Sequence, residues 1–274
     1  MVTGRRNKWL IVFAAVLLDV ILFAPLYSGV LGSFTPGDRV GSPSLLPRYF
    51  HWQNYIEIWK KVPLARYMLN SMLYAVGACV IGVGAALPAG YAVSRFKFCG
   101  RQMFLFLVLT TQMVSVSVII IPMFRSLVTL NLFDSSLAVV VTISAMPVPL
   151  IVWLLKNYFD TIPVELEEAG AVDGCTRLGA LFRIVLPVSL PGLVTSVIIA
   201  FTTTYNQFFI PMVFLSSASK YPALVGVYTM ASELVPSWHL VMASCLVVLV
   251  PPLVVFFLCQ RYVMGGLIAG AVKS

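Results

Sequence analysis

Charged residues are scarce in this chain. They make up 10% of the 274 residues, whereas apolar residues make up 60% and the mean hydropathy is +0.96. A soluble domain carries about 25% charged and about 45–50% apolar residues. The shortage of charge excludes an ordinary soluble enzyme, a disordered tail and a nucleic-acid-binding module, and it predicts a chain that is dissolved in lipid.

Several functional motifs are also missing. The sequence has no G-x-x-x-x-G-K-S/T loop, and none of its seven lysines follows a glycine, so it cannot cradle ATP phosphates in that way. The five cysteines form no C-x-x-C pair and have no histidine nearby, which argues against a metal site or a disulfide framework. We therefore expect no cofactor, no metal and no enzymatic activity of its own.

Apolar windows long enough to cross a bilayer occur six times, since about 20 apolar residues are needed for each crossing. They lie near 9–31, 68–93, 103–125, 136–156, 191–214 and 240–261. The sequence predicts an all-α integral membrane protein with six transmembrane helices. Its parts are an N-terminal tail and first helix (1–31), an external loop (32–67) and a five-helix core (68–274).

The distribution of Lys and Arg predicts the orientation. With the N-terminus inside, 11 of these residues lie inside and 7 outside, and the short link 95–101 alone carries three. The positive-inside rule gives most weight to short links, so both ends are expected in the cytoplasm. Asp19 is the single acid within a span; it either pairs with a neighbouring helix or faces water, because no second acid completes a proton relay.

Aromatic residues and prolines each allow two interpretations. The aromatic run in residues 49–59 suits either the lipid–water interface or contact with an external partner. The spans contain eight prolines, which bend helices either for packing or for gating. They are Pro25, Pro88, Pro122, Pro147, Pro149, Pro211, Pro251 and Pro252.

Half of the acids lie in one short segment: five of ten fall within residues 160–173. Pro163 suits the first turn of a helix, and the carboxylates at 165, 167 and 168 favour its positive N-terminal end. Asp173 and Gly174 are expected to end this helix, because glycine takes the left-handed conformation readily. The sequence thus predicts a short acidic helix within a loop at 157–190.

A second short helix is expected to follow it and to end at Pro187. Its apolar positions, Leu178, Leu181, Phe182 and Val185, have the i, i+3, i+4, i+7 spacing of a single helical face. An acidic helix braced in this way is suited to fit into a groove of another protein.

The same segment resembles a family motif. Residues 168–174 (E-A-G-A-V-D-G) and 183–187 (R-I-V-L-P) are similar to the E-A-A-x-x-D-G…I-x-L-P loop of ABC-importer permeases. Five further segments resemble the carbohydrate-uptake, maltose-permease-like branch of that family. They are Asn70-Ser71, the Y-A-V-S-R run at 91–95, Ile121-Pro122, Y-N-Q-F at 205–208 and the G-L-I-A-G-A-V-K tail at 266–273. Gly170, Ser115, Tyr205 and Gln207 depart from the usual residues of the family.

The resemblance implies a type I importer permease in the plasma membrane of a prokaryote, whose coupling helix, between spans four and five, docks on a cytoplasmic ATPase. Its implied partners are a second homologous permease, two ATP-binding subunits, an extracytoplasmic sugar-binding protein, membrane lipid and the sugar itself. The implied coupling residues are Glu165, Glu168, Ala169, Gly170, Asp173, Gly174, Arg183 and Pro187.

Polar residues within the spans are candidates for the translocation path, because such groups normally face a bundle interior or water. These candidates are Gln112, Thr203, Tyr205, Asn206 and Gln207. They can equally well form helix–helix hydrogen bonds. The competing function is a gradient-driven secondary transporter or channel for a small polar solute, but the chain lacks the internal repeat and membrane charge network usual in that class.

Overall fold

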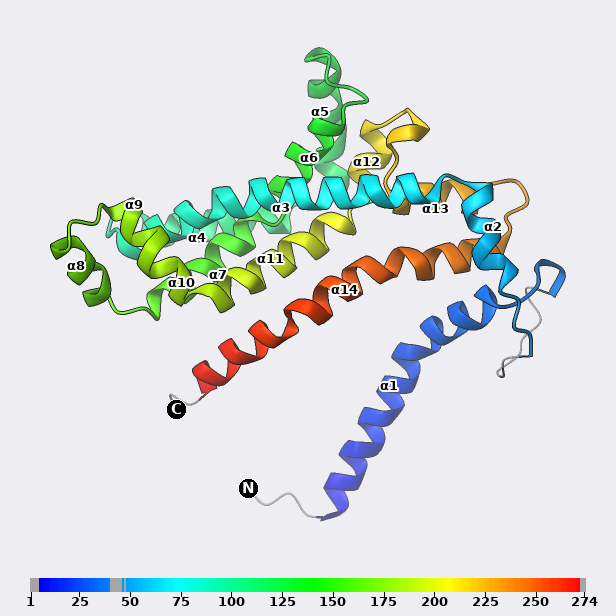
Figure 1. The fold of residues 1–274 in the computed structure, drawn as a ribbon, viewed down its shortest axis with the longest axis horizontal. Coiled ribbons are helices and arrows are strands. Elements are labelled where there is room, and N and C mark those ends of the chain that lie inside the picture. Colours follow the sequence, from blue (N-terminus) through cyan, green and yellow to red (C-terminus); the bar gives the residue numbers. More distant parts are fainter. Residues whose placement is uncertain (1–4, 40–45, 47, 272–274) are drawn as a thin grey trace. The chain divides into compact units, whose positions relative to one another are not determined.

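The computed structural model describes residues 5–39, 46 and 48–271, and these form helices and no strands (Figure 1). Three helices are long and apolar enough to cross a membrane singly: Ile11–Ser33 of α1 (Arg5–Ser33), α3 (Leu64–Arg95) and Trp238–Gln260 of α14 (Trp238–Ala271). Three bent helix pairs raise the number of candidate spans to six, which agrees with the all-α prediction. The last two residues of the tail motif lie outside the described residues.

The predicted span 103–125 is sharply bent. It comprises α4 (Arg101–Thr110), η2 (Thr111–Met113) and α5 (Val116–Thr129), with an angle of 91° between the two arms. The break lies at Ser115, whose backbone is extended and whose hydroxyl accepts a hydrogen bond from the amide of Ser117. Helix α5 continues through Pro122. An N-cap, rather than a proline, therefore produces the largest bend in this region.

The predicted span 136–156 consists of α6 (Ser136–Ala145) and α7 (Val148–Asp160), which meet at 46°. Here a proline does stand at the break, since Pro147 is the residue before α7. Gln112 donates from Nε2 to the carbonyl of Met146 over 2.8 Å and so satisfies a backbone group at the break.

The prediction of a single helix at 191–214 is wrong. Helix α11 (Leu190–Tyr205) ends at Tyr205, and α12 (Phe209–Phe214) is a separate short helix. The amide of Asn206 donates to the carbonyl of Thr202, and the amide of Gln207 donates to that of Thr204, which tightens the last turn and ends the helix. The polar residues Asn206 and Gln207 stand at this break, but the apolar window was read across them as one span.

The chain divides into two compact units. The first contains residues 1–65 and 226–249, with α1, η1 (Gly37–Arg39) and α2 (Gln53–Lys61). In it, the ring of Phe34 stacks on Phe50 and contacts Trp52 and Tyr55. The side chain of Asn54 donates to the carbonyl of Ser33, which fixes the start of α2 beside the end of α1. The aromatic residues thus pack on one another, while Phe50 and Trp52 remain more than half exposed.

The second unit contains residues 66–225 and 250–274 and has two hydrophobic clusters. One joins Tyr91 of α3 to Phe159 of α7 and to Leu181 and Val185. The other joins Tyr74 of α3 to α6 and α12. Helix α3 therefore contributes to both clusters and is the element that they share.

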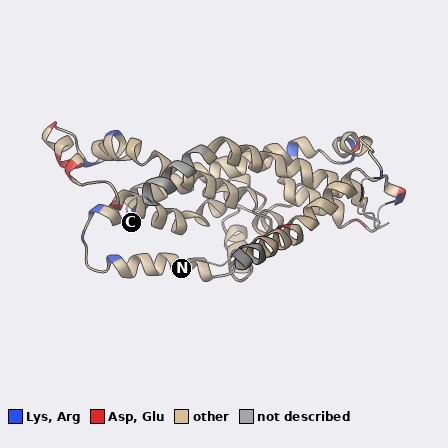
Figure 2. Cartoon of the chain, turned by 90° about the horizontal axis from the view of Figure 1, so that it is seen from below, with Lys and Arg blue, Asp and Glu red and all other residues tan. Residues whose placement is uncertain are grey.

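Charged residues lie mainly at helix ends and in the links between helices, while long stretches of helix carry none (Figure 2). Within the second unit, Arg95 ends α3, Arg101 begins α4 and Asp160 ends α7, so these charges gather at one end of the helices. The acidic helix α8 (Glu165–Val172) and α9 (Arg177–Ala180) also lie at this end (Figure 1).

Helix α3 packs very closely on the α6–α7 segment at two glycines. A Cβ atom placed on Gly82 would lie 2.8 Å from the carbonyl oxygen of Ser144, and one on Gly90 would lie 3.2 Å from that of Val152. Small residues permit this kind of backbone approach between membrane helices.

We expect Gly82→Ala to destabilise the protein by about 1–3 kcal/mol, because a backbone carbonyl must move to admit the methyl group. Gly84→Ala is the matched control on the same helix, since nothing lies within 4 Å of its added Cβ. Thermal unfolding in detergent gives the melting temperature of each variant. Equal melting temperatures for the two variants would contradict the close approach.

Candidate coupling site

Helix α8 has the start and end that the sequence predicts. It begins at Glu165, directly after Val164, and Asp173 is its C-cap. Gly174 has a φ of +85°, its amide donates to Ala171, and the amide of the next residue donates to the carbonyl of Gly170. This pair of bonds is the Schellman arrangement, which needs a left-handed residue at the position of Gly174. The predicted helix and its glycine stop are confirmed.

One partly buried ion pair joins α8 to the end of α3. Arg95 Nε and Glu167 Oε1 lie 2.5 Å apart, and each side chain is 11% exposed. The hydroxyl of Tyr91 donates to the other oxygen of the same carboxylate over 2.5 Å. Arg95 also donates from Nη2 to the carbonyl of Ile162, in the link before α8. Three polar contacts therefore hold α8, and the link at 161–164 that precedes it, against α3.

The importance of Glu167 was not predicted, although the signals were present. Tyr91 and Arg95 belong to the Y-A-V-S-R run, and Glu167 stands three residues before Gly170, which is the buried residue of α8. Residues three apart share a helical face, so Glu167 lies on the side of α8 that faces the protein. The sequence does not reveal which cation it meets.

A second polar cluster lies beside the first. Asp160 accepts a hydrogen bond from the hydroxyl of Ser94 over 2.6 Å, and it pairs with Lys156 at 2.6 Å and Arg101 at 3.6 Å. It thereby joins the ends of α3 and α7 to the start of α4. Ion pairs of Glu167 and of Asp160 thus both fix the segment around α8 to the neighbouring helices.

Most of the predicted coupling residues are exposed. Gly170 is the exception, because it is buried on the side of α8 that contacts the end of the Ile184 side chain. A Cβ at this position would require the flexible end of Ile184 to shift. The exposed members are Glu165, Glu168, Ala169, Asp173, Gly174, Arg183 and Pro187.

The predicted apolar face of the second short helix is only half right. Leu181 and Val185 are fully buried, whereas Leu178 and Phe182 are 65% and 57% exposed. The reason is η3 (Leu181–Val185), a π-helical turn between α9 and α10 (Leu186–Val188), which breaks the 3.6-residue phase. The helical segment ends one residue after Pro187.

A cleft of about 600 Å³ lies between the end of α3 and the pair α8–α9. Its lining includes Lys97, Arg177 and Glu168, and the Arg177 guanidinium lies 5.1 Å from the centre of the Phe96 ring. The ion pair of Arg95 and Glu167 forms part of the wall. The cleft therefore exposes charges of both signs beside the acidic helix.

The candidate translocation residues are dispersed. Asn206 and Gln112 are exposed, and Thr203 and Gln207 are partly buried. Tyr205 is 3% exposed and stacks on Phe201 with ring centres 5.6 Å apart, so it lies in the packed interior of the subunit.

A set of helices long and apolar enough to cross a membrane six times, with an anchored acidic helix at one end, defines a multi-pass membrane transport subunit. Comparison with known proteins specifies the class. Residues 80–267 match the family described as the binding-protein-dependent transport system inner membrane component, and the chain belongs to that family. It is a permease subunit of an ABC importer, and a gradient-driven transporter is not supported.

The relatives agree with this assignment. The inner membrane ABC transporter permease protein YcjP of Escherichia coli is 32% identical, with 100% of both chains covered. The sulfoquinovosyl glycerol transport system permease protein SmoH of Agrobacterium fabrum is 29% identical over 81% of this chain and 78% of its own. The same fold occurs in a bacterial ABC transporter involved in alginate import, with a TM-score of 0.80, 22% identity and coverage of 96% and 99%.

We expect Glu167→Gln to lower the free energy of unfolding by about 3 kcal/mol, because it leaves the Arg95 charge largely buried without its counterion. Glu165→Gln is the control, since Glu165 lies on the same helix with its side chain exposed. Denaturant unfolding of the purified protein distinguishes them. If the two variants are equally stable, the pair does not anchor α8.

Proposed function

We propose that this chain forms half of the translocation pathway of an ATP-driven sugar importer and transmits closure of the ATPase through α8. The observation that carries the proposal is the combination of an exposed acidic surface on α8 with a partly buried anchor, Glu167, on its other side. A helix that only linked two spans would need no such anchor. The partners are a second permease, two ATP-binding subunits and an external binding protein.

The surface of α8 is suited to a cationic groove on the ATPase. Glu165, Glu168 and Asp173 are exposed, and carboxylates make their strongest contacts with Arg and Lys donors. Gly174 sets the direction in which the chain leaves this surface. The chain itself supplies no nucleotide-binding loop, so ATP hydrolysis belongs to the partner.

We place α8 and both chain ends in the cytoplasm. In the second unit, Arg95, Lys97, Arg101, Lys156 and Arg177 all lie at the ends of helices or in links near α8. A concentration of cations at one end of the spans is typical of the cytoplasmic side.

The proposed substrate is a sugar or sugar derivative. This rests on the resemblance of the 205–208 and 266–273 motifs to the carbohydrate branch and on the printed function of the Agrobacterium relative. Asn206, Gln207, Thr203 and Gln112 carry amides and hydroxyls that can bond to sugar hydroxyls. Tyr205, being buried, supports this region by packing.

Gly174→Pro is expected to abolish uptake while membrane insertion persists, because proline cannot adopt a φ of +85°. Gly174→Asn is the control, since asparagine tolerates the left-handed region, and it should retain most of the uptake. Charge reversal at Glu168 should also abolish uptake. Radiolabelled sugar uptake, together with membrane immunoblots, measures these effects. Full uptake by Gly174→Pro and Glu168→Lys would refute the coupling role.

Asn206→Ala combined with Gln207→Ala should reduce transport by about tenfold while ATPase binding is retained, because two polar side chains leave the proposed path. Thr195→Ala is the matched control in α11, since its hydroxyl bonds to the Pro191 carbonyl of its own helix. Sugar uptake, and the amount of ATPase that co-purifies with the permease, are measured for both variants. Normal transport with impaired assembly would show that these residues only join helices.

A further inference from the structure

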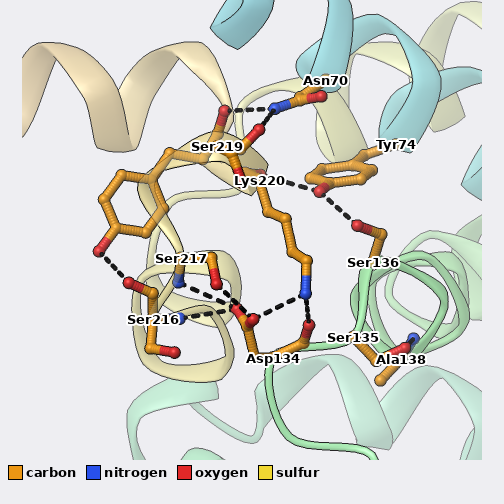
Figure 3. A network of polar contacts seen from close by, with 11 residues as sticks. Asn70, Tyr74, Asp134, Ser135, Ser136, Ala138, Ser216, Ser217, Ser219 and Lys220 are labelled. Atoms are coloured by element: carbon orange, nitrogen blue, oxygen red, sulfur yellow. Dashed lines mark hydrogen bonds and ion pairs between the residues drawn. The ribbon is translucent and has the colours of Figure 1, made fainter.

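The carboxylate of Asp134 joins two links of the second unit, at 130–135 and 215–222 (Figure 3). Its Oδ1 accepts hydrogen bonds from the amides of Ser216 and Ser217, at 3.0 and 3.1 Å. Its Oδ2 accepts from the hydroxyl of Ser217 at 2.6 Å and from Lys220 Nζ at 2.7 Å. Four donors therefore satisfy one carboxylate, and the contact with Lys220 is an ion pair.

The backbone of Asp134 takes part as well. Its amide donates to the carbonyl of Phe214 over 3.0 Å, and its carbonyl accepts a further hydrogen bond from Lys220 Nζ. Asp134 has a φ of +58° and Asn131 has a φ of +55°, values that are uncommon for residues other than glycine. Such a conformation persists where surrounding contacts determine it. The contacts of Asp134 thus determine the conformation of the 130–135 link.

The hydrogen bond from Lys220 affects the ionisation of Asp134. Together with the bonds from Ser217 and Ser216, it holds the pKa of the carboxyl well below its usual range. A lowered pKa means that the stabilising effect is present above the unfolded-state pKa of about 3.9 and is lost as the pH falls further. The ion pair is therefore intact at neutral pH.

The same cluster reaches the first turns of α3. The hydroxyl of Tyr74 donates to the carbonyl of Lys220 over 2.8 Å and bonds with the hydroxyl of Ser136. The side chain of Asn70 donates to the carbonyls on both sides of Lys220, each at 3.0 Å. Ser71 accepts from the amide of Ala223. The Asn70-Ser71 pair thus holds the 215–222 link to α3.

Helix α3 connects this cluster to the coupling site. Tyr74 and Tyr91 are 17 residues apart, about 26 Å at the 1.5 Å rise of a helix. Between them, α3 packs in both hydrophobic clusters and closely approaches α6–α7 at Gly82. At its far end, Tyr91 and Arg95 hold Glu167 of α8. One continuous helix therefore carries a polar anchor at each end.

We propose that Asp134 and Lys220 are positioning residues for transport, which fix the two links to α3 so that movement of α8 reaches them. This proposal rests on the proposed function, because the movement comes from the ATPase. A purely structural role for the cluster predicts that its variants exchange amide hydrogens faster in the links, while the links still respond to closure of the ATPase.

Hydrogen exchange on the assembled permease–ATPase complex separates these roles, with ATP plus vanadate as the probe that closes the ATPase. In the wild type, closure should change amide exchange both in α8 and in residues 64–74 and 215–222, by about tenfold. Asp134→Asn should keep the response in α8 and in residues 64–74 and lose it in residues 215–222. Lys220→Met should behave in the same way, and Lys220→Arg should retain all three responses because it keeps the charge.

Asp38→Asn is the matched control, since Asp38 pairs with the neighbouring Arg39 at the surface of the first unit, and it should respond as the wild type does. A normal response of residues 215–222 in Asp134→Asn would overturn the positioning role while leaving the proposed function intact. If α8 itself fails to respond in the wild type, the proposed coupling function is wrong.

Discussion

The partly buried ion pair between Arg95 and Glu167 is the contact on which the rest of the coupling site depends. A short helix that carries three acids, with a fourth at its C-cap, would be poorly held by hydrophobic packing, because most of its surface is exposed. The pair provides the missing attachment, and the hydroxyl of Tyr91 satisfies the second carboxylate oxygen. Since an unpaired charge at this depth is costly, α8 and α3 are expected to move together.

The packing of α3 explains how such a movement can be carried through the subunit. This helix contributes to both hydrophobic clusters, and its glycines bring it against the backbone of α6–α7. Close-packed interiors deform little, so displacement of one end is transferred rather than absorbed. The bends at Ser115 and Pro147 divide the neighbouring spans into shorter arms, while α3 remains continuous.

The sequence predicted the features that depend on local chemistry. Apolar length predicted the number of candidate spans, and Gly174 predicted the end of α8, because each signal lies within the residues concerned. It did not predict the bend at Ser115, the break after Tyr205 or the π-turn at Leu181, since neither an apolar window long enough to span a membrane nor an apolar spacing shows where the helix within it is interrupted. Nor did it pair Glu167 with Arg95, because 72 residues separate them and only folding brings them together.

The assembled importer offers the most direct test of this account, through a double-mutant cycle on ATP-driven sugar uptake in proteoliposomes. Arg95→Met and Glu167→Gln are measured singly and together. If the two side chains act as one link, each single variant should lose about tenfold in uptake and the double variant should lose no more than the worse single one. Losses that multiply, or single variants that transport at the wild-type rate, would contradict the claim that this pair carries the movement of α8 into α3.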